Sequence, residues 1–560
     1  MHHGDRFTLV FNGEIYNARE LRGELEAGGA TFQTKTDTEV LLAAFAAWGE
    51  ACLLRLRGMF AFALADWEKQ RLVLARDPLG IKPLVYFHHG GVFAFASEIN
   101  ALRCIPVVRA ANELDPVALD SFLRLLYISA PRTIYRHIRK LPPAHFLSLD
   151  LRDGAVKMDR YWSLQYAPDE GRSSAEWQEA ADEAIARSVV THLASDVPVG
   201  VLLSGGVDST LMAMEAQRAG GALRTFTIGF PGASANDERE IARTVATDLS
   251  AEHFETIMPP GVGDLLERAV QHCGEPFGDS SLLCAWELCR FAKQHVGVVL
   301  SGDGGDELFA GYPLYREWLR RAAWSSGPHP LWKRMLQPFL HTIRPLRWPN
   351  LNPEVAGAGL WTECVEHMPT QMRRSLWRRE LWDDAFAGAP QEISDSFGKT
   401  RSLTPLTRAQ ACDLAVYLPG DILPKMDTAS MAHGLEARTP LVDVRLAEFA
   451  ATIPASELTS GDPGDARSWR GKRLLKHRVA QRFPHAFTER RKQGFTAPLQ
   501  QWLSYDKAGR ERLRHALESA DSPLRQWFEP AALARIGTSA NDHHRWQMLF
   551  LSVWAESAAR

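Results

Sequence analysis

The sequence predicts an α/β protein with two different sheet layers and a helical C-terminal part. Three short apolar runs between residues 197 and 301 are separated by stretches long enough for helices, and each is followed by a polar or glycine-rich loop. This alternation is typical of a parallel sheet covered by helices. The first hundred residues contain short strand-like runs close together and two helical stretches, which indicates an α+β layer.

The composition indicates a globular enzyme that acts on small molecules. Of the 560 residues, 45% are hydrophobic and 23% are charged, which is enough for two or three ordinary domains. The formal charge of −3 gives no reason to expect nucleic acid or a membrane as a partner, and no apolar run approaches the roughly 18 residues of a membrane span. The seven cysteines are scattered without metal-binding spacing. We therefore expect a cytoplasmic protein.

The first functional motif follows a strand expected at residues 7–11. Asn12-Gly-Glu-Ile-Tyr-Asn17 places a side-chain amide beside a backbone N–H, a pair that can stabilise a developing oxyanion. Thr36-Asp-Thr-Glu, Gly58-Met-Phe-Ala-Phe-Ala and Ala75-Arg-Asp-Pro-Leu-Gly-Ile-Lys follow in order. Together these motifs resemble the class II glutamine amidotransferase (Ntn-hydrolase) domain of asparagine synthetases. The resemblance implies that Asn12 and Gly13 form an oxyanion hole. It also implies that Asp37 holds the α-amino group of glutamine, with Glu14 beside it.

The chain departs from this family at its start. Family members begin with Met-Cys, whose thiol is the nucleophile, whereas this chain begins Met1-His-His-Gly-Asp. The earliest cysteine, Cys52, lies in an apolar helical stretch and has the surroundings of a structural residue. We therefore interpret residues 1–106 as a truncated glutamine amidotransferase domain. Either the start codon is assigned too late, which we favour because Asn12, Gly13 and Asp37 form an intact set, or glutaminase activity has been lost. On both accounts we expect no glutamine hydrolysis by this chain.

Residues 107–175 read as the end of the glutaminase domain and a connector. A helix is expected at 116–127, a Pro-rich turn at Leu141-Pro-Pro-Ala and short strands around 146–149. The third region, residues 176–560, begins with a helix at about 175–192. It contains all of the nucleotide-binding motifs described below.

The apolar run that starts at Val197 ends in Ser204-Gly-Gly-Val-Asp-Ser209, and a helix is expected to begin near Leu211. Glycines let backbone N–H groups turn toward an anion, the two serines add donors, and the helix offers its positive end. The spacing fits neither a P-loop nor a dinucleotide-binding turn. It resembles the pyrophosphate loop of the ATP pyrophosphatase (PP-loop) superfamily. The resemblance implies that ATP pyrophosphate is bound by Ser204, Gly205, Gly206, Asp208 and Ser209.

Two further strands are expected at 223–230 and 296–301, the latter ending in Gly302-Asp-Gly-Gly-Asp-Glu307. Loops that follow parallel strands open on one edge of the sheet, so these acids face the pyrophosphate loop. Carboxylates near a polyphosphate repel it unless a hard cation lies between them. We therefore expect Mg²⁺ bound by Asp208 and Asp306.

The run Ser301-Gly-Asp-Gly-Gly-Asp-Glu-Leu-Phe-Ala-Gly-Tyr312 resembles the second signature of asparagine synthetases and of their lactam-forming relatives. The resemblance implies that adenosine is contacted by Leu202 and Ile228 and that the nucleotide is held by Ser301 and Gly302. It places Asp303 where an acid important for the adenylate step lies, although some relatives have Glu there.

Two motifs farther along the chain complete this family pattern. Lys492, in Arg490-Arg-Lys-Gln-Gly-Phe495, resembles the lysine that neutralises phosphate charge in the adenylation transition state. The stretch from Leu423 to Asp443 contains four charged residues that we expect to frame the site by ion pairs: Asp427, Glu436, Arg438 and Asp443.

The resemblance carried by these motifs implies an ATP- and Mg²⁺-dependent ligase that forms asparagine from aspartate through β-aspartyl-AMP. Nitrogen would come from glutamine in a complete enzyme and from ammonia in this chain, and family members are often homodimers. The same motifs serve amidotransferases of polysaccharide or secondary-metabolite pathways and β-lactam synthetases, so the acceptor stays open. A tRNA-modifying PP-loop enzyme would be expected to show a basic face, which this slightly acidic chain lacks. A non-catalytic regulatory homologue is the other alternative, and it does not explain why Asp208, Asp306 and Lys492 are all present.

Overall fold

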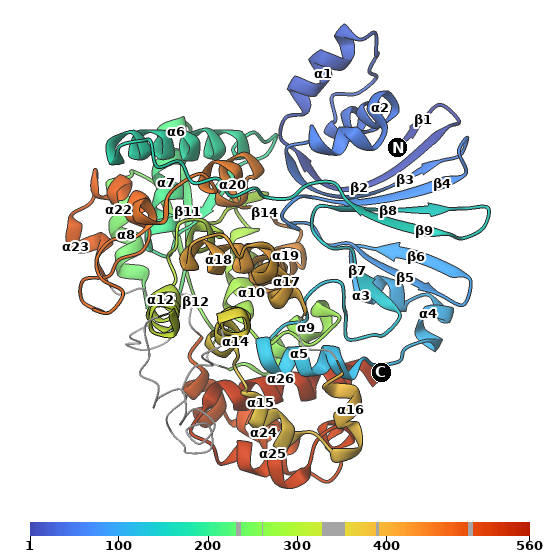
Figure 1. The fold of residues 1–560 in the computed structure, drawn as a ribbon, viewed down its shortest axis with the longest axis vertical. Helices are drawn as coiled ribbons and strands as arrows, with labels where there is room; N and C mark the ends of the chain where they lie inside the picture. Colours follow the sequence, from blue (N-terminus) through green and yellow to red (C-terminus); the bar gives the residue numbers. More distant parts are fainter. Residues whose placement is uncertain (231–236, 260, 327–352, 388–390, 491–496, 560) are drawn as a thin grey trace.

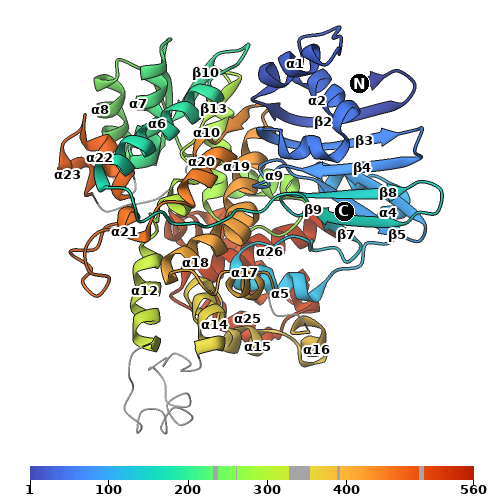
Figure 2. The ribbon, with the colours of Figure 1, turned by 45° about the horizontal axis from the view of Figure 1, so that its top comes forward.

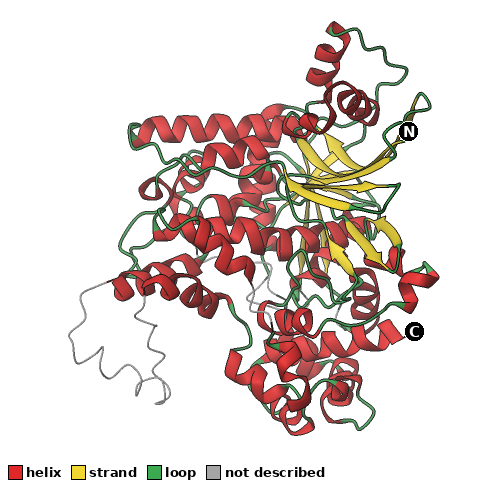
Figure 3. Ribbon diagram, turned by 45° about the vertical axis from the view of Figure 1, so that its right-hand side comes forward, coloured by secondary structure: helices red, strands yellow, loops and turns green. Residues whose placement is uncertain are grey.

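The computed structural model describes residues 1–230, 237–259, 261–326, 353–387, 391–490 and 497–559. Figure 1 shows the antiparallel strands on one side, the parallel sheet on the other and the C-terminal helices below both. Figure 3 shows the same division, with the strands gathered toward the N-terminus and helices over the rest. Within the described residues, no helix combines the length and the hydropathy that a membrane crossing requires.

The N-terminal layer is a six-stranded antiparallel sheet packed on a smaller sheet. The large sheet has the order β1 (His2–His3), β2 (Phe7–Ile15), β3 (Gly58–Asp66), β4 (Arg71–Arg76), β8 (His145–Asp150) and β9 (Val156–Arg160). The small sheet has the order β6 (Val92–Ala96), β5 (Val85–His89) and β7 (Ile138–Lys140). The helices of this part are α1 (Ala18–Ala27), α2 (Asp37–Trp48), α3 (Ile99–Arg103), α4 (Pro106–Ala110) and α5 (Pro116–Leu125).

Strand β3 shows why the two faces of this sheet differ. Side chains alternate across a strand, so Phe60 and Phe62 face the core beneath α1 and α2, whereas Ala61 and Ala63 face the core shared with the small sheet. The large aromatic rings fill the space under the helices. The alanines let the second sheet approach closely.

The second sheet is fully parallel and confirms the predicted α/β class. Its order is β12 (Glu252–Ile257), β11 (Arg224–Gly229), β10 (Val199–Leu202), β13 (Val298–Leu300) and β14 (Glu436–Arg438). Strands β10, β11 and β13 are the three expected from the sequence, and β12 and β14 are additional. The helices of this part are α6 (Ser174–His192), α7 (Val207–Ala219), α8 (Arg239–Asp248), α9 (Gly263–Cys273), α10 (Ser281–Ala292) and α11 (Gly305–Leu308).

The strand order places α7 and α8 on one face of the sheet and α10 on the other. The chain crosses from β10 to β11 and then to β12 in one direction along the sheet, and it returns in the other direction to β13. Because such connections are right-handed, α10, which precedes β13, lies on the face opposite to α7 and α8. Figure 2 shows α6, α7 and α8 together and α10 beside α19. Helix α7 begins at Val207, not near Leu211, because Gly206 takes the extended N-cap conformation.

The remainder is helical. It contains α12 (Pro313–Ser326), α14 (Pro353–Val365), α15 (Thr370–Leu376), α16 (Trp382–Ala385), α17 (Gln391–Lys399), α18 (Pro405–Cys412), the π-helix η3 (Asp413–Ile422), α19 (Leu423–Met431), α20 (Val444–Ala450), α21 (Ala455–Leu458), α22 (Arg473–Ala480), α23 (His485–Thr488), α24 (Lys507–Glu518), α25 (Pro530–Gly537) and α26 (Asp542–Ala559). The largest fully buried side chains of the molecule are tryptophans, and several lie here, including Trp361, Trp377, Trp502 and Trp546. These rings anchor the helices to one continuous core with the parallel sheet.

Candidate functional sites

The loop after β10 is held in shape by its own hydroxyl groups. Ser204 Oγ lies 3.0 Å from Ser209 Oγ, and the backbone N–H of Gly206 donates to Ser204 Oγ at 3.2 Å. Gly205 has a φ of +74°, and a Cβ there would lie 2.6 Å from Ile241 of α8. Only glycine fits this position. The loop therefore presents its hydroxyl groups and the N-terminus of α7 at the carboxyl end of the sheet, an arrangement that suits an anion.

The loop after β13 lies directly against this pyrophosphate-type loop. A Cβ on Gly302 would lie 2.8 Å from Asp208 Cβ, and a Cβ on Gly305 would lie 2.7 Å from Asp208 Oδ1. Ser301 Oγ donates to Asp303 Oδ2 at 2.8 Å, which fixes the acid relative to the strand end. The two loops thus touch because both positions that face Asp208 lack side chains.

Lys472 joins the acids of the two loops. Its Nζ contacts Asp208 Oδ2 and lies 2.7 Å from Asp306 Oδ1. The lysine is 6% exposed and precedes α22 with a φ of +56°, a conformation that directs it into this position. Burial alone would lower the pKa of Lys472, but Asp208 and Asp306 outweigh it and raise the pKa, so the side chain stays charged. Lys472 is not among the site residues expected from the sequence.

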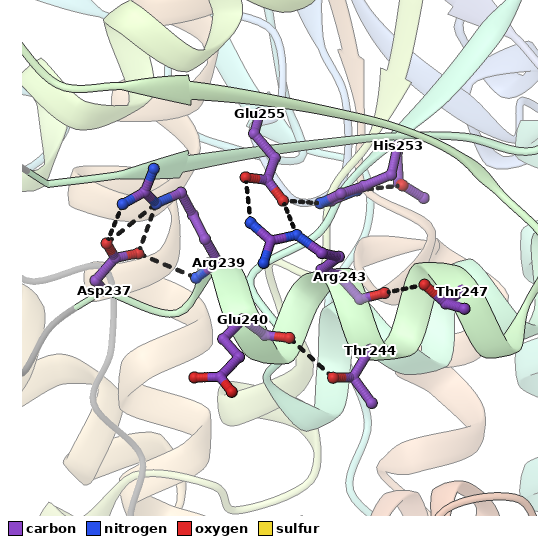
Figure 4. A network of polar contacts seen from close by, with 9 residues as sticks. Asp237, Arg239, Glu240, Arg243, Thr244, Thr247, His253 and Glu255 are labelled. Carbon is purple, nitrogen blue, oxygen red and sulfur yellow. Dashed lines mark hydrogen bonds and ion pairs between the residues drawn. The ribbon is translucent and has the colours of Figure 1, made fainter.

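The candidate adenosine-contacting residues lie at the ends of adjacent strands. Leu202 ends β10 and Ile228 lies in β11, and both are largely buried. Beyond the end of β11, the side chain of Arg239 occupies the space where a Cβ on Gly229 would lie. Figure 4 shows Arg239 held by Asp237, with distances of 2.6–3.0 Å between guanidinium and carboxylate. Helix α8 therefore begins with a fixed charged pair beside this strand end.

The candidate glutamine site lies at the end of β2. Asn12 Nδ2 donates to Ser97 Oγ at 3.3 Å, and the N–H of Ile15 donates to Asp37 Oδ2 at 3.0 Å. A Cβ on Gly13 would lie 2.0 Å from the Met59 carbonyl oxygen, so β3 requires glycine at this point. The structure thus places Asp37 against the end of the strand that carries Asn12 and Gly13, and a role of these residues in glutamine binding stays a prediction.

Glu14 connects this site to the parallel sheet. Burial raises the pKa of the Glu14 carboxyl group to about 7, with Asp37 adding to the effect and Arg438 opposing it. The Arg438 guanidinium lies 3.5 Å from Glu14 and 2.6 Å from Glu436. The Arg438 carbonyl accepts the N–H of Ser301 at 2.9 Å. One residue of β14 therefore touches both candidate sites.

Two further ion pairs join the halves of the molecule. Arg57 Nε donates to Asp443 Oδ2 at 2.7 Å, and Lys82 Nζ lies 3.0 Å from Asp427 Oδ1. The four charged residues that we expected to frame the site, Asp427, Glu436, Arg438 and Asp443, thus all form ion pairs. Three of the four contact the N-terminal domain, a role that the sequence did not indicate.

Comparison with known proteins identifies both halves. The Asparagine synthase family pattern matches residues 180–556, and the Glutamine amidotransferase domain pattern matches residues 1–162. The chain belongs to the asparagine synthetase family. The Bacillus subtilis protein named "Asparagine synthetase (glutamine-hydrolyzing) 1" is 31% identical over 567 residues, which cover 98% of this chain and 85% of that protein.

Other relatives carry either a similar name or a different one. A Mycobacterium tuberculosis protein whose name refers to the same enzyme is 33% identical over 98% of this chain and 84% of its own length. A Penicillium rubens protein named "Amidase chyE" is 27% identical over 84% of this chain and 74% of its own length. The resemblance stated from the motifs is therefore confirmed, and so is the use of ATP that the family implies.

The acids of this asparagine synthetase family member suit a hard cation. Asp208 and Asp306 converge on one ammonium group, so their geometry already serves a positive charge. In the part of the chain that the structure describes, no group of three or more His, Cys, Asp or Glu side chains is arranged to hold a metal ion. Two carboxylates supplemented by phosphate oxygens are the usual way in which Mg²⁺ is bound beside ATP. The residues present thus fit Mg²⁺ together with a nucleotide.

Lys492 lies outside the described residues. Arg490, two positions earlier, donates through Nη2 to the Gly205 carbonyl at 2.8 Å, so the chain reaches the pyrophosphate loop just before that segment.

In the amidotransferase domain, Cys52 is fully buried, and burial raises the pKa of its thiol to about 12. A thiol with that pKa is neutral and inert at physiological pH.

Proposed function

We propose that this chain forms asparagine from aspartate and ammonia with ATP, through a β-aspartyl-AMP intermediate. The observation that supports the proposal most directly is the contact between the loops after β10 and β13, with Lys472 bridging Asp208 and Asp306. A phosphate-binding loop and a pair of acids at one sheet edge suit the removal of pyrophosphate from ATP.

In the proposed reaction, a side-chain carboxylate oxygen of aspartate attacks the α-phosphorus of ATP. The bond to the bridging oxygen breaks and pyrophosphate leaves toward Ser204, Gly206 and Ser209, whose donors stabilise its charge. Ammonia then attacks the acyl carbon, and AMP leaves as asparagine forms. Lys472 can neutralise part of the charge that develops on the pyrophosphate, and Lys492 is proposed to act beside it.

Magnesium is proposed to bind to Asp208 and Asp306 together with phosphate oxygens. When bound, the ion neutralises charge on the leaving pyrophosphate. Asp303 is proposed to keep its place beside Ser301 during adenylation, because the hydrogen bond between them fixes the acid at the strand end.

We also propose that this chain uses free ammonia. Cys52 and Cys104 are the only cysteines among residues 1–106, and neither adjoins Asn12 or Gly13. Cys52 is buried in the core, and Cys104 is an exposed residue that follows α3. A glutaminase assay tests this: ammonium should support asparagine formation and glutamine should not. Glutamate release well above the background rate would contradict it.

The adenylation proposal is tested by ATP–pyrophosphate exchange. L-aspartate should stimulate exchange, and Asp208→Ala should abolish it while the protein stays folded. An active Asp208→Ala variant would contradict the proposal.

The relative named as an amidase favours a second candidate, the same chemistry on another acid. Exchange with a polysaccharide or secondary-metabolite acid, but not with aspartate, would establish that candidate.

A further inference from the structure

A groove with a volume of about 680 Å³ lies between α6, α7 and α22. Helix α22 packs against both α6 and α7, and Figure 2 shows the three helices together. One wall is a face of α6 whose residues recur every three or four positions from Gln178 to Ala186, and the other is a face of α22 from Arg473 to Gln481. The groove includes none of the residues of the phosphate-facing loops described above.

The two walls of this groove carry opposite charges. The acids lie on α6 and the arginines lie on α22 and at the end of α7: Glu179, Asp182 and Glu183 on the first wall, and Arg218, Arg473 and Arg478 on the second. One of the two walls would repel a ligand with a single sign of charge. The groove therefore suits a small molecule that carries both charges.

The floor of the groove sets how far apart those two charges lie. Arg478 Nε donates at 2.8 Å to Oε1 of Glu215, a carboxylate of α7 whose side chain is only 3% exposed. The same guanidinium lies 3.7 Å from Asp182 Oδ2 on the opposite wall. Because the walls approach so closely, a ligand must carry its two charges close together. The ammonium and carboxylate groups of a free α-amino acid are attached to one carbon atom and meet this requirement.

Two charges near the rim are available to such a ligand. Within the described part of the chain, the exposed side chain of Glu179 forms neither an ion pair nor a hydrogen bond. Arg218 is 64% exposed, and its Nη1 lies 3.7 Å from Glu215 Oε2, which is too long for a hydrogen bond. Both side chains can therefore turn toward a ligand without breaking a buried contact.

The helices of the groove also lead to the adenylation site. Helix α7 begins beside Asp208 and ends one residue after Arg218. Helix α22 begins directly after Lys472, and its first residue, Arg473, lines the groove. Lys472 pairs with Asp208 and Asp306, the two acids proposed to bind Mg²⁺. A ligand that holds α7 and α22 against α6 stabilises the arrangement in which the lysine, and not a metal ion, satisfies these acids.

We propose that this groove is a regulatory site for a free α-amino acid and that its occupation opposes the binding of Mg²⁺. The ammonium group of the amino acid faces Glu179 and Asp182, and its carboxylate faces Arg218. The regulatory effect rests on the magnesium site of the proposed function, whereas binding in the groove does not. Under that function L-asparagine is the product, so the groove would provide feedback.

The first test measures binding without ATP. Hydrogen exchange of the full chain is followed by mass spectrometry with L-asparagine, L-aspartate and L-glutamine in turn, and at least one of them should slow exchange in α6 and α22. Analogues that lack one charge, which are succinamate and asparaginamide for asparagine, should bind at least about tenfold more weakly in calorimetry, because a charged group is then left unpaired. Protection of these helices by none of the three amino acids would overturn the proposal, and so would equal affinity for the analogues.

The second test uses the double variant Glu179→Gln/Arg218→Met. Both residues are exposed and outside the adenylation site, so the variant should fold and keep its ATP–pyrophosphate exchange, but the amino acid should no longer protect α6 and α22. The matched control is Lys293→Met, which removes an exposed lysine at the end of α10 that donates to the Gly434 carbonyl, and it should keep the protection. Thermal unfolding checks the folding of each variant. Unchanged protection in the double variant would overturn the site.

The coupling is measured by calorimetry with Mg²⁺ and pyrophosphate, which requires no turnover. The amino acid should weaken their binding to the parent by about fivefold or more and leave the double variant unaffected. Equal weakening in both proteins would place the effect outside the groove and overturn the regulatory role. If the parent shows the protection and the weakening but no acid supports ATP–pyrophosphate exchange, the proposed function fails and the regulatory site stands.

Discussion

Replacing Lys472 with methionine is the most informative perturbation of the adenylation site. Methionine keeps most of the aliphatic length and removes the ammonium group that contacts Asp208 and Asp306. The three side chains are only 7%, 17% and 11% exposed, so solvent cannot take over the role of the lysine. Without nucleotide and magnesium, the variant should therefore be markedly less stable.

The expected loss follows from the burial of these charges. Removing one partner of a buried ion pair costs about 3–5 kcal/mol, because the remaining charge is left uncompensated. Here one lysine serves two carboxylates, so we expect a value of about 4 kcal/mol. For a cooperative unit of the size of the synthetase domain, this corresponds to a fall in the unfolding temperature of about 5 °C.

Calorimetry in the presence of a chelator measures this change. Lys293→Met is the control, since an exposed lysine contributes less than about 1 kcal/mol. Asp208→Asn in the Lys472→Met background should recover at least half of the loss. Magnesium with pyrophosphate should stabilise Lys472→Met more than the parent, because a cation then meets two uncompensated acids. A Lys472→Met unfolding temperature within 1 °C of the parent would show that the ammonium group does not stabilise the two acids.

Three further predictions test other parts of the structure. Gly302→Ala should cost about 1–3 kcal/mol of stability and abolish exchange, because its Cβ would lie 2.8 Å from Asp208 Cβ; denaturant titration and exchange assays check this. Glu14→Gln should stabilise the protein increasingly as pH rises from about 4.5 to 7. Between pH 4.5 and 7 the folded state retains the Glu14 proton and the unfolded state does not. Above pH 7, native Glu14 therefore lowers the free energy of unfolding by on the order of 2 kcal/mol, a value reduced because the side chain is 34% exposed. An equal difference in stability between Glu14→Gln and the parent at pH 5 and at pH 8 would contradict this prediction. Cys52 should resist iodoacetamide in the native protein, and Cys52→Ala should leave ammonia-dependent synthesis unchanged, as alkylation mass spectrometry and kinetics will show.

Strands β10 and β13 were predictable because buried parallel strands are continuous apolar runs, and β11 because Phe226 and Ile228 alternate with threonines in Arg224-Thr-Phe-Thr-Ile-Gly229. Strand β12 was not, since Glu252-His-Phe-Glu-Thr-Ile257 is a partly exposed edge strand with little apolar signal. Strand β14 is only three residues long, and its place in the sheet depends on pairing with β13 more than a hundred residues earlier. Local patterns cannot reveal such pairing.

The candidate site shows the same limit. Asp208 and Asp306 were found because each lies in a motif that follows a strand. Lys472 lies 264 residues beyond Asp208, and its role depends on a left-handed backbone conformation before α22. The loops that carry Asp208 and Asp306 are local in sequence, whereas the lysine that pairs with both acids is not.

The proposed reaction joins the aspartate side chain to AMP. Aspartate labelled with oxygen-18 in its side-chain carboxylate, incubated with ATP and ammonium, tests it by mass spectrometry of the nucleotide product. One labelled oxygen should pass to AMP for each asparagine formed, because the attacking oxygen stays on phosphorus when ammonia displaces AMP. Unlabelled AMP, or label in inorganic phosphate with ADP as the product, would show that aspartate is not adenylated.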